Sequence, residues 1–227
     1  MIALLLAAAS LAGPPTWEDI QAVSSWTEHA TRKHAETGRI QVLKTTLSGV
    51  ECFKGIATAP VPGDLLLQVA ADVEGTPRWS SAGVAEAEEF TKTASAMEYY
   101  QYLDVPGWTL SADRFWFLTS QMGRVGDAWT FTWNRLEEGG AHHDAWLRVR
   151  EAHPDAIEPP INVGGWVFTP QGDTTRIDYY LCSDTGGTIP KSVQSAATTR
   201  TRCSPGAMVH ALINYTVLAP YQHKAGS

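Results

Sequence analysis

The sequence predicts an α+β fold in which an antiparallel sheet grips one long closing helix, and three observations support this. Strand-like runs fill the middle of the chain, whereas helical patterns lie towards both ends, as is typical of α+β domains. The last apolar run, Arg176–Cys182, leads to Gly186-Gly187, which permit a sharp turn, and then to Pro190, which suits a first helical turn. The helical pattern that follows extends to about Gln222. The space between sheet and helix could hold a ligand.

The first segment, residues 1–12, is apolar and helix-prone, with small residues at Ser10 and Ala12. This pattern is typical of the core of an export signal peptide, and the segment is too short to span a bilayer. We therefore expect a periplasmic or secreted protein. The alternative is a cytoplasmic protein with a frayed N-terminus.

The elements that follow are predicted from apolar periodicity and turn residues. A helix is expected from its N-cap Thr16 to about Glu36, and a second helix over Asp64–Val73. Strands over Ile40–Leu47 and Val50–Thr58 flank Ser48-Gly49, a hairpin signal. No second composition block appears, so we expect one domain over residues 16–222. The further strands are expected at Ala85–Thr93, Met97–Val105, Arg114–Gln121, Ala128–Leu136, Ala145–Ala152, Gly165–Thr169 and Thr175–Ser183.

The closing helix is apolar on more than one side, whereas a surface helix needs only one apolar stripe. We therefore expect it to be buried in the core or to cover a lipid-filled cavity. Pro205 interrupts the segment and is expected to let its two halves move separately. The two stripes consist of Met208, Ala211, Leu212 and Tyr215, and of Val209, Ile213 and Val217.

Charge and aromatic content narrow the function. The net charge of −7 argues against nucleic acid as a partner, because phosphate binding needs a basic surface. The nine tryptophans exceed what a core of this length needs, and predict either a large aromatic core or an aromatic-lined cavity.

Cysteine and histidine spacings indicate no metal centre. The three cysteines form no CxxC pair; a Cys182–Cys203 disulfide and three buried thiols are equally compatible with the spacing. In His142-His143-Asp144, adjacent strand residues would point to opposite faces, so we expect no metal site. No nucleophile motif or phosphate-binding glycine loop is present in the sequence.

Short motifs along Thr16–Tyr221 follow one another in a characteristic order. They are Phe53-Lys54-Gly55, Trp79, Tyr100-Gln101-Tyr102, Pro106 with Trp108, Arg114, Val149-Arg150, Trp166 with Pro170, and Asp184–Ser192. In order and spacing they resemble the START family of lipid-binding and lipid-transfer domains, in particular its bacterial members. One departure is that Arg114 is followed by Phe115 and preceded by Asp113, whereas the family usually has Arg-Asp followed by an aromatic residue.

The resemblance implies a helix-grip fold, with a curved antiparallel sheet of about nine strands around a long C-terminal helix. It also implies one apolar tunnel for a sterol or a phospholipid. Arg150 matches an arginine that in some members lies inside the cavity beside an acid, and Glu98 is the expected partner. The alternative is that Arg150 faces solvent. The ligand-binding residues are expected to be Glu98, Tyr100, Trp116, Trp133, Trp146, Arg150, Trp166, Tyr180, Met208 and Leu212.

The expected function is to bind one lipid and carry it between membranes, as a monomer that touches the membrane briefly and needs no cofactor. Burial of lipid gains roughly 25 cal/mol per Å², and a membrane offers a similar gain, so loading and unloading can balance. Gly123, Gly126 and Pro205 are expected to form a gate. One alternative is a polyketide-cyclase-type enzyme that uses Glu98, Tyr100, Arg150 and Tyr180 for acid–base chemistry. Another is a lipid sensor without transfer activity.

Overall fold

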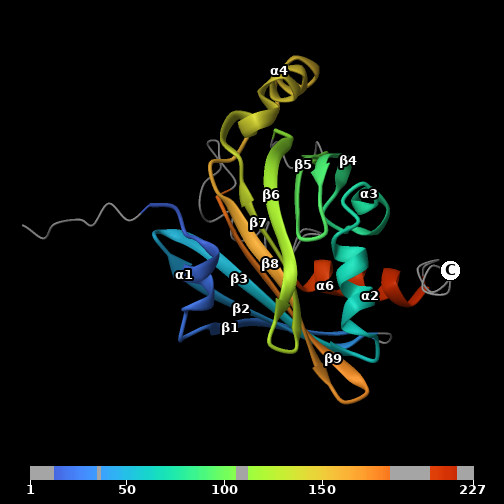
Figure 1. Cartoon of the computed structure of the whole chain (residues 1–227). Coiled ribbons are helices and arrows are strands. Elements are labelled where there is room, and N and C mark those ends of the chain that lie inside the picture. The colour runs from blue at the N-terminus through green and yellow to red at the C-terminus, as the bar shows by residue number, and fades with distance from the viewer. Residues whose placement is uncertain (1–12, 35–36, 106–111, 185–204, 219–227) are drawn as a thin grey trace, which may run out of the picture.

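The computed structural model describes residues 13–34, 37–105, 112–184 and 205–218. Its centre is a curved antiparallel sheet of nine strands in the order β1-β2-β3-β9-β8-β7-β6-β5-β4 (Figure 1). The last strand therefore lies between β3 and β8, which joins the two halves of the sheet. The predicted α+β helix-grip class is confirmed. The strands are β1 Thr27–His34, β2 Gly38–Leu47, β3 Val50–Ala59, β4 Val84–Lys92, β5 Ala96–Leu103, β6 Arg114–Val125, β7 Ala128–Arg135, β8 Asn162–Gln171 and β9 Thr174–Ser183.

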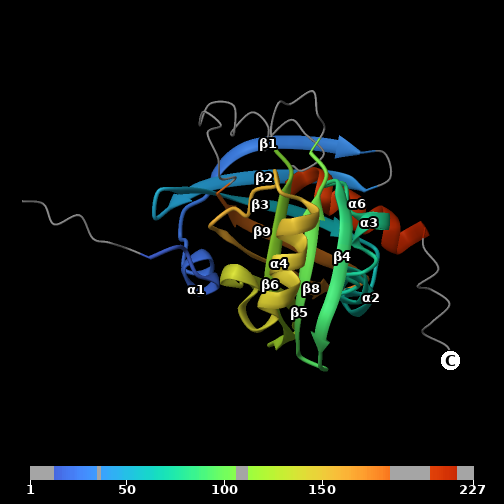
Figure 2. The same cartoon turned by 90° about the horizontal axis from the view of Figure 1, so that it is seen from above.

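The helices lie on both faces of this sheet. They are α1 Trp17–Gln21, α2 Gly63–Ala70, α3 Thr76–Trp79, the 3-10 segment η2 Glu137–His142, α4 His143–Ala152 and α6 Pro205–Leu218. We call the face that carries α2, α3 and α6 the inner face, and the face that carries α1 and α4 the outer face. Both views separate α1 from α2, α3 and α6 (Figures 1 and 2). None of the described helices is long and apolar enough to cross a membrane.

The β2–β3 hairpin forms as predicted, because its turn residues adopt the required backbone. Ser48 and Gly49 have φ angles of 48° and 78°, and Leu47 pairs with Val50 directly across the turn. Such positive φ values at both central positions match the right-handed twist of the flanking strands. The local sequence therefore determines this hairpin.

Helix α6 lies very close to the sheet because both elements have a glycine where they touch. Gly55 is the glycine of the sheet, and Gly206 is the glycine of the helix. A Cβ at Gly55 of β3 would lie 3.0 Å from Val209 and 3.2 Å from the Pro205 carbonyl oxygen. A Cβ at Gly206 would lie 3.2 Å from a methyl group of Val42. Of this helix the structure describes Pro205–Leu218. The expected movement about Pro205 also involves residues 185–204, which lie outside the described residues.

The first helix begins where expected but is much shorter than predicted. Thr16 accepts a hydrogen bond from the Asp19 amide, and Asp19 accepts one from the Thr16 amide, which forms a capping box. The helix ends at Gln21, and Thr27–His34 forms β1, paired antiparallel with β2. Pairing with a strand that is already in the sheet outweighs the weak helical periodicity of this segment.

The predicted strand over Ala145–Ala152 is wrong, since this segment is helix α4. Ala145 and Val149 are four residues apart, so in a helix they share one face, and both pack into the aromatic cluster on the outer face of β5 and β6. In a run of only eight residues, the apolar positions fit both the two-residue period of a strand and the 3.6-residue period of a helix. Periodicity alone therefore cannot decide between the two.

Two further expectations change in the structure. Cys52 and Cys182 form a disulfide between facing positions of β3 and β9, so the Cys182–Cys203 pairing is wrong, and Cys203 itself lies outside the described residues. The expected loop over Gly123–Asp127 is a tight hairpin, because β6 continues to Val125, which pairs with Ala128. Gly126, with φ of 59°, and Asp127 form its two-residue turn.

Candidate ligand-binding face

The inner face and α6 enclose the largest apolar cluster of the described residues. Strand residues two apart point to the same face, so alternate positions of the neighbouring strands β5 to β9 contribute to this cluster, while α6 itself packs on β2, β3, β9 and α2. Burying such side chains stabilises the fold by roughly 1.5–3 kcal/mol each. The cluster includes Met97, Tyr99, Trp116, Leu118, Phe131, Trp133, Trp166, Phe168, Ile177 and Tyr179 from the sheet, and Met208, Val209, Leu212 and Ile213 from α6.

The aromatic rings of this face pack against one another. The ring centroid of Tyr179 lies 4.2 Å from that of Trp166 and 6.0 Å from that of Trp133. Gly164 faces Trp133 across the β7–β8 pair, and a Cβ there would lie 2.5 Å from the indole ring. A glycine at this position is therefore what allows Trp133 to lie flat on β8.

The polar groups of the inner face differ in whether they have partners. Trp133 donates its indole N–H to Oδ1 of Asn162 at 2.9 Å, and Ser120 donates to the Met97 carbonyl oxygen at 3.3 Å. By contrast, the buried indole N–H groups of Trp79 and Trp116 have no hydrogen-bond partner in the part of the chain that the structure describes.

Arg114 is the charged residue at the start of β6 on this face, and it is only 5% exposed. It donates to the backbone carbonyl oxygens of Ala112 and Asp113. Burial lowers the pKa of the Arg114 guanidinium, and the neighbouring Asp113 carboxylate opposes that shift. An arginine nevertheless stays protonated at neutral pH.

Five of the ten residues expected to bind a ligand meet on the inner face. They are Trp116, Trp133, Trp166, Met208 and Leu212. The other five lie on the outer face or on α4. Glu98, Tyr100 and Tyr180 belong to strands whose alternate residues face inward, and Trp146 and Arg150 belong to α4.

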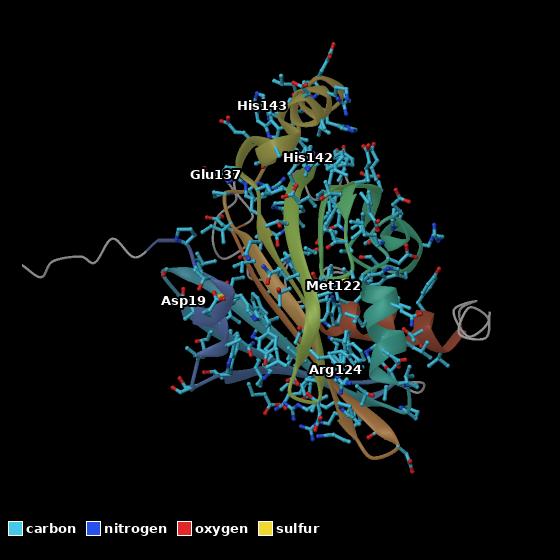
Figure 3. The ribbon with its side chains drawn as sticks, in the orientation of Figure 1. Asp19, Met122, Arg124, Glu137, His142 and His143 are labelled. Atoms are coloured by element: carbon cyan, nitrogen blue, oxygen red, sulfur yellow. A yellow bond between two sulfur atoms is a disulfide. The ribbon has the colours of Figure 1, made fainter. Side chains whose placement is uncertain are left out.

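The expected pairing of Arg150 with Glu98 is wrong. Arg150 donates to the Ala156 carbonyl oxygen at 3.2 Å, and its guanidinium lies 5.8 Å from the Trp146 ring. Glu98 instead lies 2.7 Å from Nε2 of His142, the residue that precedes α4 (Figure 3). The helical conformation of α4 is the cause, because a strand there would have placed Arg150 within the sheet.

The remaining outer-face candidates have local structural partners. Tyr100 donates its hydroxyl to Glu86 at 3.0 Å, and Trp146 donates its indole N–H to Glu158 at 2.7 Å. Tyr180 packs edge-on against Trp17 of α1, and Lys54 lies over its ring at 4.6 Å. The Tyr180–Trp17 contact joins α1 to the sheet, and α4 is joined to it through Glu158, which also pairs with Arg135 of β7.

Tyr99, Tyr179 and Trp79 are inner-face residues absent from the expected ligand-binding set. In β5, Met97 and Tyr99 alternate with Glu98 and Tyr100, so both faces of the strand carry large side chains. Periodicity therefore could not tell which tyrosine points inward. The available signal was Met97, since a methionine is more often buried than a glutamate.

The expected gate residues lie at separate places. Gly123 is inside β6, opposite Thr130, and Gly126 is in the turn that follows. Met122 and Arg124 mark this part of β6, which lies far from α4 (Figure 3). Pro205 is buried at the first described position of α6, against β3. Their role as a gate stays a prediction.

Within residues 13–34, 37–105, 112–184 and 205–218, no three His, Cys, Asp or Glu side chains gather in a way that could hold a metal ion. His142 and His143 point to different surroundings, since His143 bonds to the Glu138 carbonyl oxygen at 3.0 Å. The described histidines are thus used in packing: His142, His143 and His153 around α4, His34 and His210 at α6, and His29 against Phe53.

Comparison with solved structures identifies the fold. A STAR-related lipid transfer protein fragment from Xanthomonas axonopodis superposes with a TM-score of 0.66 at 20% identity, over 85% of this chain and 98% of that one. Human STARD10 superposes with a TM-score of 0.68 at 16% identity, over 93% of this chain and 84% of that one. Human StAR-related lipid transfer protein 5 superposes with a TM-score of 0.70 at 12% identity, over 88% of this chain and 90% of that one. The resemblance expected from the motifs is confirmed for the fold, which is that of START domains. No family model and no curated protein matches the sequence.

Proposed function

We propose that this protein binds one hydrophobic lipid, a sterol or a phospholipid, between the inner face and α6, and carries it between membranes. The observation that carries the proposal is the single cluster of apolar and aromatic side chains to which α6 and five strands contribute on the inner face, in a START fold. Uptake is driven by burial of apolar lipid surface, at roughly 25 cal/mol per Å². Because a bilayer offers a comparable gain, the carrier can release its cargo as well as load it.

Transient membrane contact is proposed for the end of the molecule formed by the β6–β7 and β8–β9 hairpins. Val125, at the first tip, is 72% exposed, although it is apolar. Arg124 lies over the Trp129 ring at 4.6 Å, which places a cation and an indole beside that tip. A surface hollow of about 350 Å³ lies next to them, lined in part by Pro62, Trp129 and Pro170. Tryptophan and a basic residue beside an exposed aliphatic side chain suit a membrane interface.

A carrier is favoured over a polyketide cyclase because the residues considered for acid–base chemistry do not converge. Glu98 pairs with His142, Arg150 donates to a backbone carbonyl, and Tyr180 packs against α1. We propose that the carrier acts as a monomer. We also propose export, which the Cys52–Cys182 disulfide supports, since disulfides persist mainly in oxidising compartments.

Native mass spectrometry of the purified protein, with extraction of bound molecules, is the first test. A stoichiometric sterol or phospholipid is the expected result, and exchange of that lipid between donor and acceptor vesicles should follow. An empty protein that also takes up no lipid from vesicles would overturn the proposal. Conversion of a bound polyketide would favour the cyclase, and binding without exchange would favour the sensor.

The membrane contact is tested with a matched pair of variants. Val125→Asp should lower the rate of exchange between vesicles and leave the amount of bound lipid unchanged. Leu147→Asp, at a 50% exposed position on α4, is the control and should change neither quantity. Equal exchange rates for the two variants would remove the hairpin tip from the proposal.

A further inference from the structure

Two buried hydrogen-bond donors on the inner face have no partner in the described part of the protein. Trp79 and Trp116 are each 7% exposed, and no atom of the described residues accepts a hydrogen bond from either indole N–H. Trp133 is equally buried on the same face, yet its N–H is bonded to Asn162. Most buried polar groups in proteins have a partner, so the two orphan donors need an explanation.

The two indoles belong to the same region of the inner face. Trp116 on β6 pairs with Gln101 on β5, and Gln101 donates a hydrogen bond to Thr76 at 3.3 Å. Thr76 is the first residue of α3, and Trp79 is the last. The same end of α3 contacts α6, because the hydroxyl of Ser80 lies 3.4 Å from the sulfur of Met208. Both donors therefore lie in the region where α3 covers β5 and β6, and α3 in turn contacts α6.

The chemistry of an indole N–H limits what can satisfy it. This group only donates, carries no charge, and needs an acceptor such as a hydroxyl, carbonyl or ester oxygen. A purely hydrocarbon ligand would leave both donors buried without partners, which is costly. Water could serve an empty protein, but a lipid that displaces it must supply the acceptor itself.

We infer that Trp79 and Trp116 are specificity-determining residues that donate hydrogen bonds to an acceptor oxygen within the apolar part of the bound ligand. This inference rests on the proposed lipid-binding function and adds a requirement to it. The oxygen is a sterol hydroxyl or an acyl ester carbonyl, two sources of the same acceptor chemistry. Ligands without such an oxygen should bind less well than equally apolar ligands that have it.

The test compares lipid pairs that differ only in that oxygen. Delipidated wild-type protein, Trp79→Phe, Trp116→Phe and Trp133→Phe are loaded from vesicles that contain a labelled probe. The first arm uses cholesterol against 5-cholestene, which lacks the hydroxyl. The second uses dioleoyl phosphatidylcholine against its dioleyl ether analogue, which lacks the carbonyl groups. Circular dichroism confirms that each variant is folded before it is loaded.

In the arm that contains the true acceptor, the wild type should favour the oxygen-bearing probe, and Trp79→Phe and Trp116→Phe should each reduce that preference about tenfold. Trp133→Phe loses the same ring volume but should affect both members of the pair equally. The inference alone would be overturned if all three variants lost binding of both probes of a pair to the same extent. It would also be overturned if the wild type bound the two probes of each pair equally well. Failure of the wild type to bind any probe would overturn the proposed function together with it.

A spectroscopic readout separates hydrogen bonding from packing. The indole N–H signals of Trp79, Trp116 and Trp133 are assigned in ¹⁵N–¹H spectra from the signal that each Phe variant loses. On loading with the preferred probe, the signals of Trp79 and Trp116 should move downfield, whereas that of Trp133 should stay in place. Unchanged Trp79 and Trp116 signals in lipid-loaded protein would contradict the inference.

Discussion

Both faces of β5 and β6 carry buried aromatic side chains, but the polar groups of the two faces differ in whether they have hydrogen-bond partners. On the outer face, the Tyr100 hydroxyl bonds to Glu86 and the Trp146 indole of α4 bonds to Glu158. On the inner face, the indoles of Trp79 and Trp116 are buried and lack an acceptor among the described residues. Tyr100 is 4% exposed and the two indole residues are 7% exposed, so burial of the donor residue alone does not explain the difference.

This difference in hydrogen bonding distinguishes the outer face, which has a structural role, from the inner face, which holds the candidate ligand-binding site. A buried polar group that finds a partner within the protein stabilises one packing arrangement, as α4 is fastened to the outer face. A buried donor without one costs stability in the folded protein, and that cost is offset when a ligand supplies the acceptor. Aromatic content alone would not have distinguished the two faces, whereas hydrogen bonding does.

The largest expected effect that tests the comparison of the two faces comes from alanine substitutions at two neighbouring residues of β6. Phe117→Ala, on the outer face, removes a fully buried ring that stacks on Phe90 and packs at a tilt against Tyr100, and should cost about 3–5 kcal/mol of unfolding free energy. Leu118→Ala, on the inner face, should cost about 2–5 kcal/mol. Only Leu118→Ala should lower lipid occupancy. Urea unfolding and mass spectrometry of folded protein measure the two quantities, and a loss of occupancy in Phe117→Ala would break the comparison.

Reduction of the Cys52–Cys182 disulfide should have the next largest effect, because it joins residues 130 positions apart. Its loss should lower the unfolding free energy by about 2–5 kcal/mol, since the unfolded chain gains conformational freedom. Denaturant curves with and without reductant measure this. The Cys203→Ser background leaves only these two cysteines, so the change reports on this pair. Curves that coincide would show that the bond adds nothing to stability.

Two adjacent tyrosines on opposite faces give a smaller, pH-dependent effect. Tyr100→Phe loses the bond to Glu86 and should cost about 1 kcal/mol at neutral pH, whereas Tyr99→Phe should cost less. Burial raises the pKa of both phenols, with added contributions from Glu86 for Tyr100 and from Tyr179 for Tyr99.

The sign of the pH effect follows from those raised pKa values. Above pH of about 10 the tyrosines of the unfolded chain ionise while the folded ones stay protonated, so stability falls as the pH rises. Each Phe variant should therefore lose stability less steeply than the wild type. Urea unfolding at neutral pH and at two pH values on either side of 10 tests this. Parallel pH profiles for wild type and both variants would contradict the raised pKa values.

The smallest effect is expected at Arg150. Arg150→Ala removes one hydrogen bond to a backbone carbonyl and a distant contact with Trp146, so stability should change by less than about 1 kcal/mol. Lipid occupancy should stay within about twofold of the wild type, because α4 lies on the outer face. A strong loss of lipid binding in this variant would show that Arg150 belongs to the ligand-binding site after all.

Local patterns were enough to predict several elements. The Ser48-Gly49 hairpin depends on positive φ angles that those residues adopt readily, and the Thr16 capping box depends on contacts three residues apart. The strand to closing-helix order could also be predicted, since alternation and helical periodicity are properties of short windows. For the candidate site, the sequence predicted that Trp116, Trp133, Trp166, Met208 and Leu212 belong together, and they do.

The remaining features depend on contacts between distant parts of the chain. Which face of β5 points to α6 is settled by the register with β4 and β6, because a shift of one residue would exchange Tyr99 and Tyr100. The conformation of α4 depends on the aromatic cluster it covers, and the pairing of Cys52 with Cys182 depends on β9 lying next to β3. A window of ten residues holds none of these contacts, whose free energies exceed local propensities of about 1 kcal/mol or less per residue. For that reason the elements of this protein could be predicted from its sequence, while the identity of its inner face came from the folded chain.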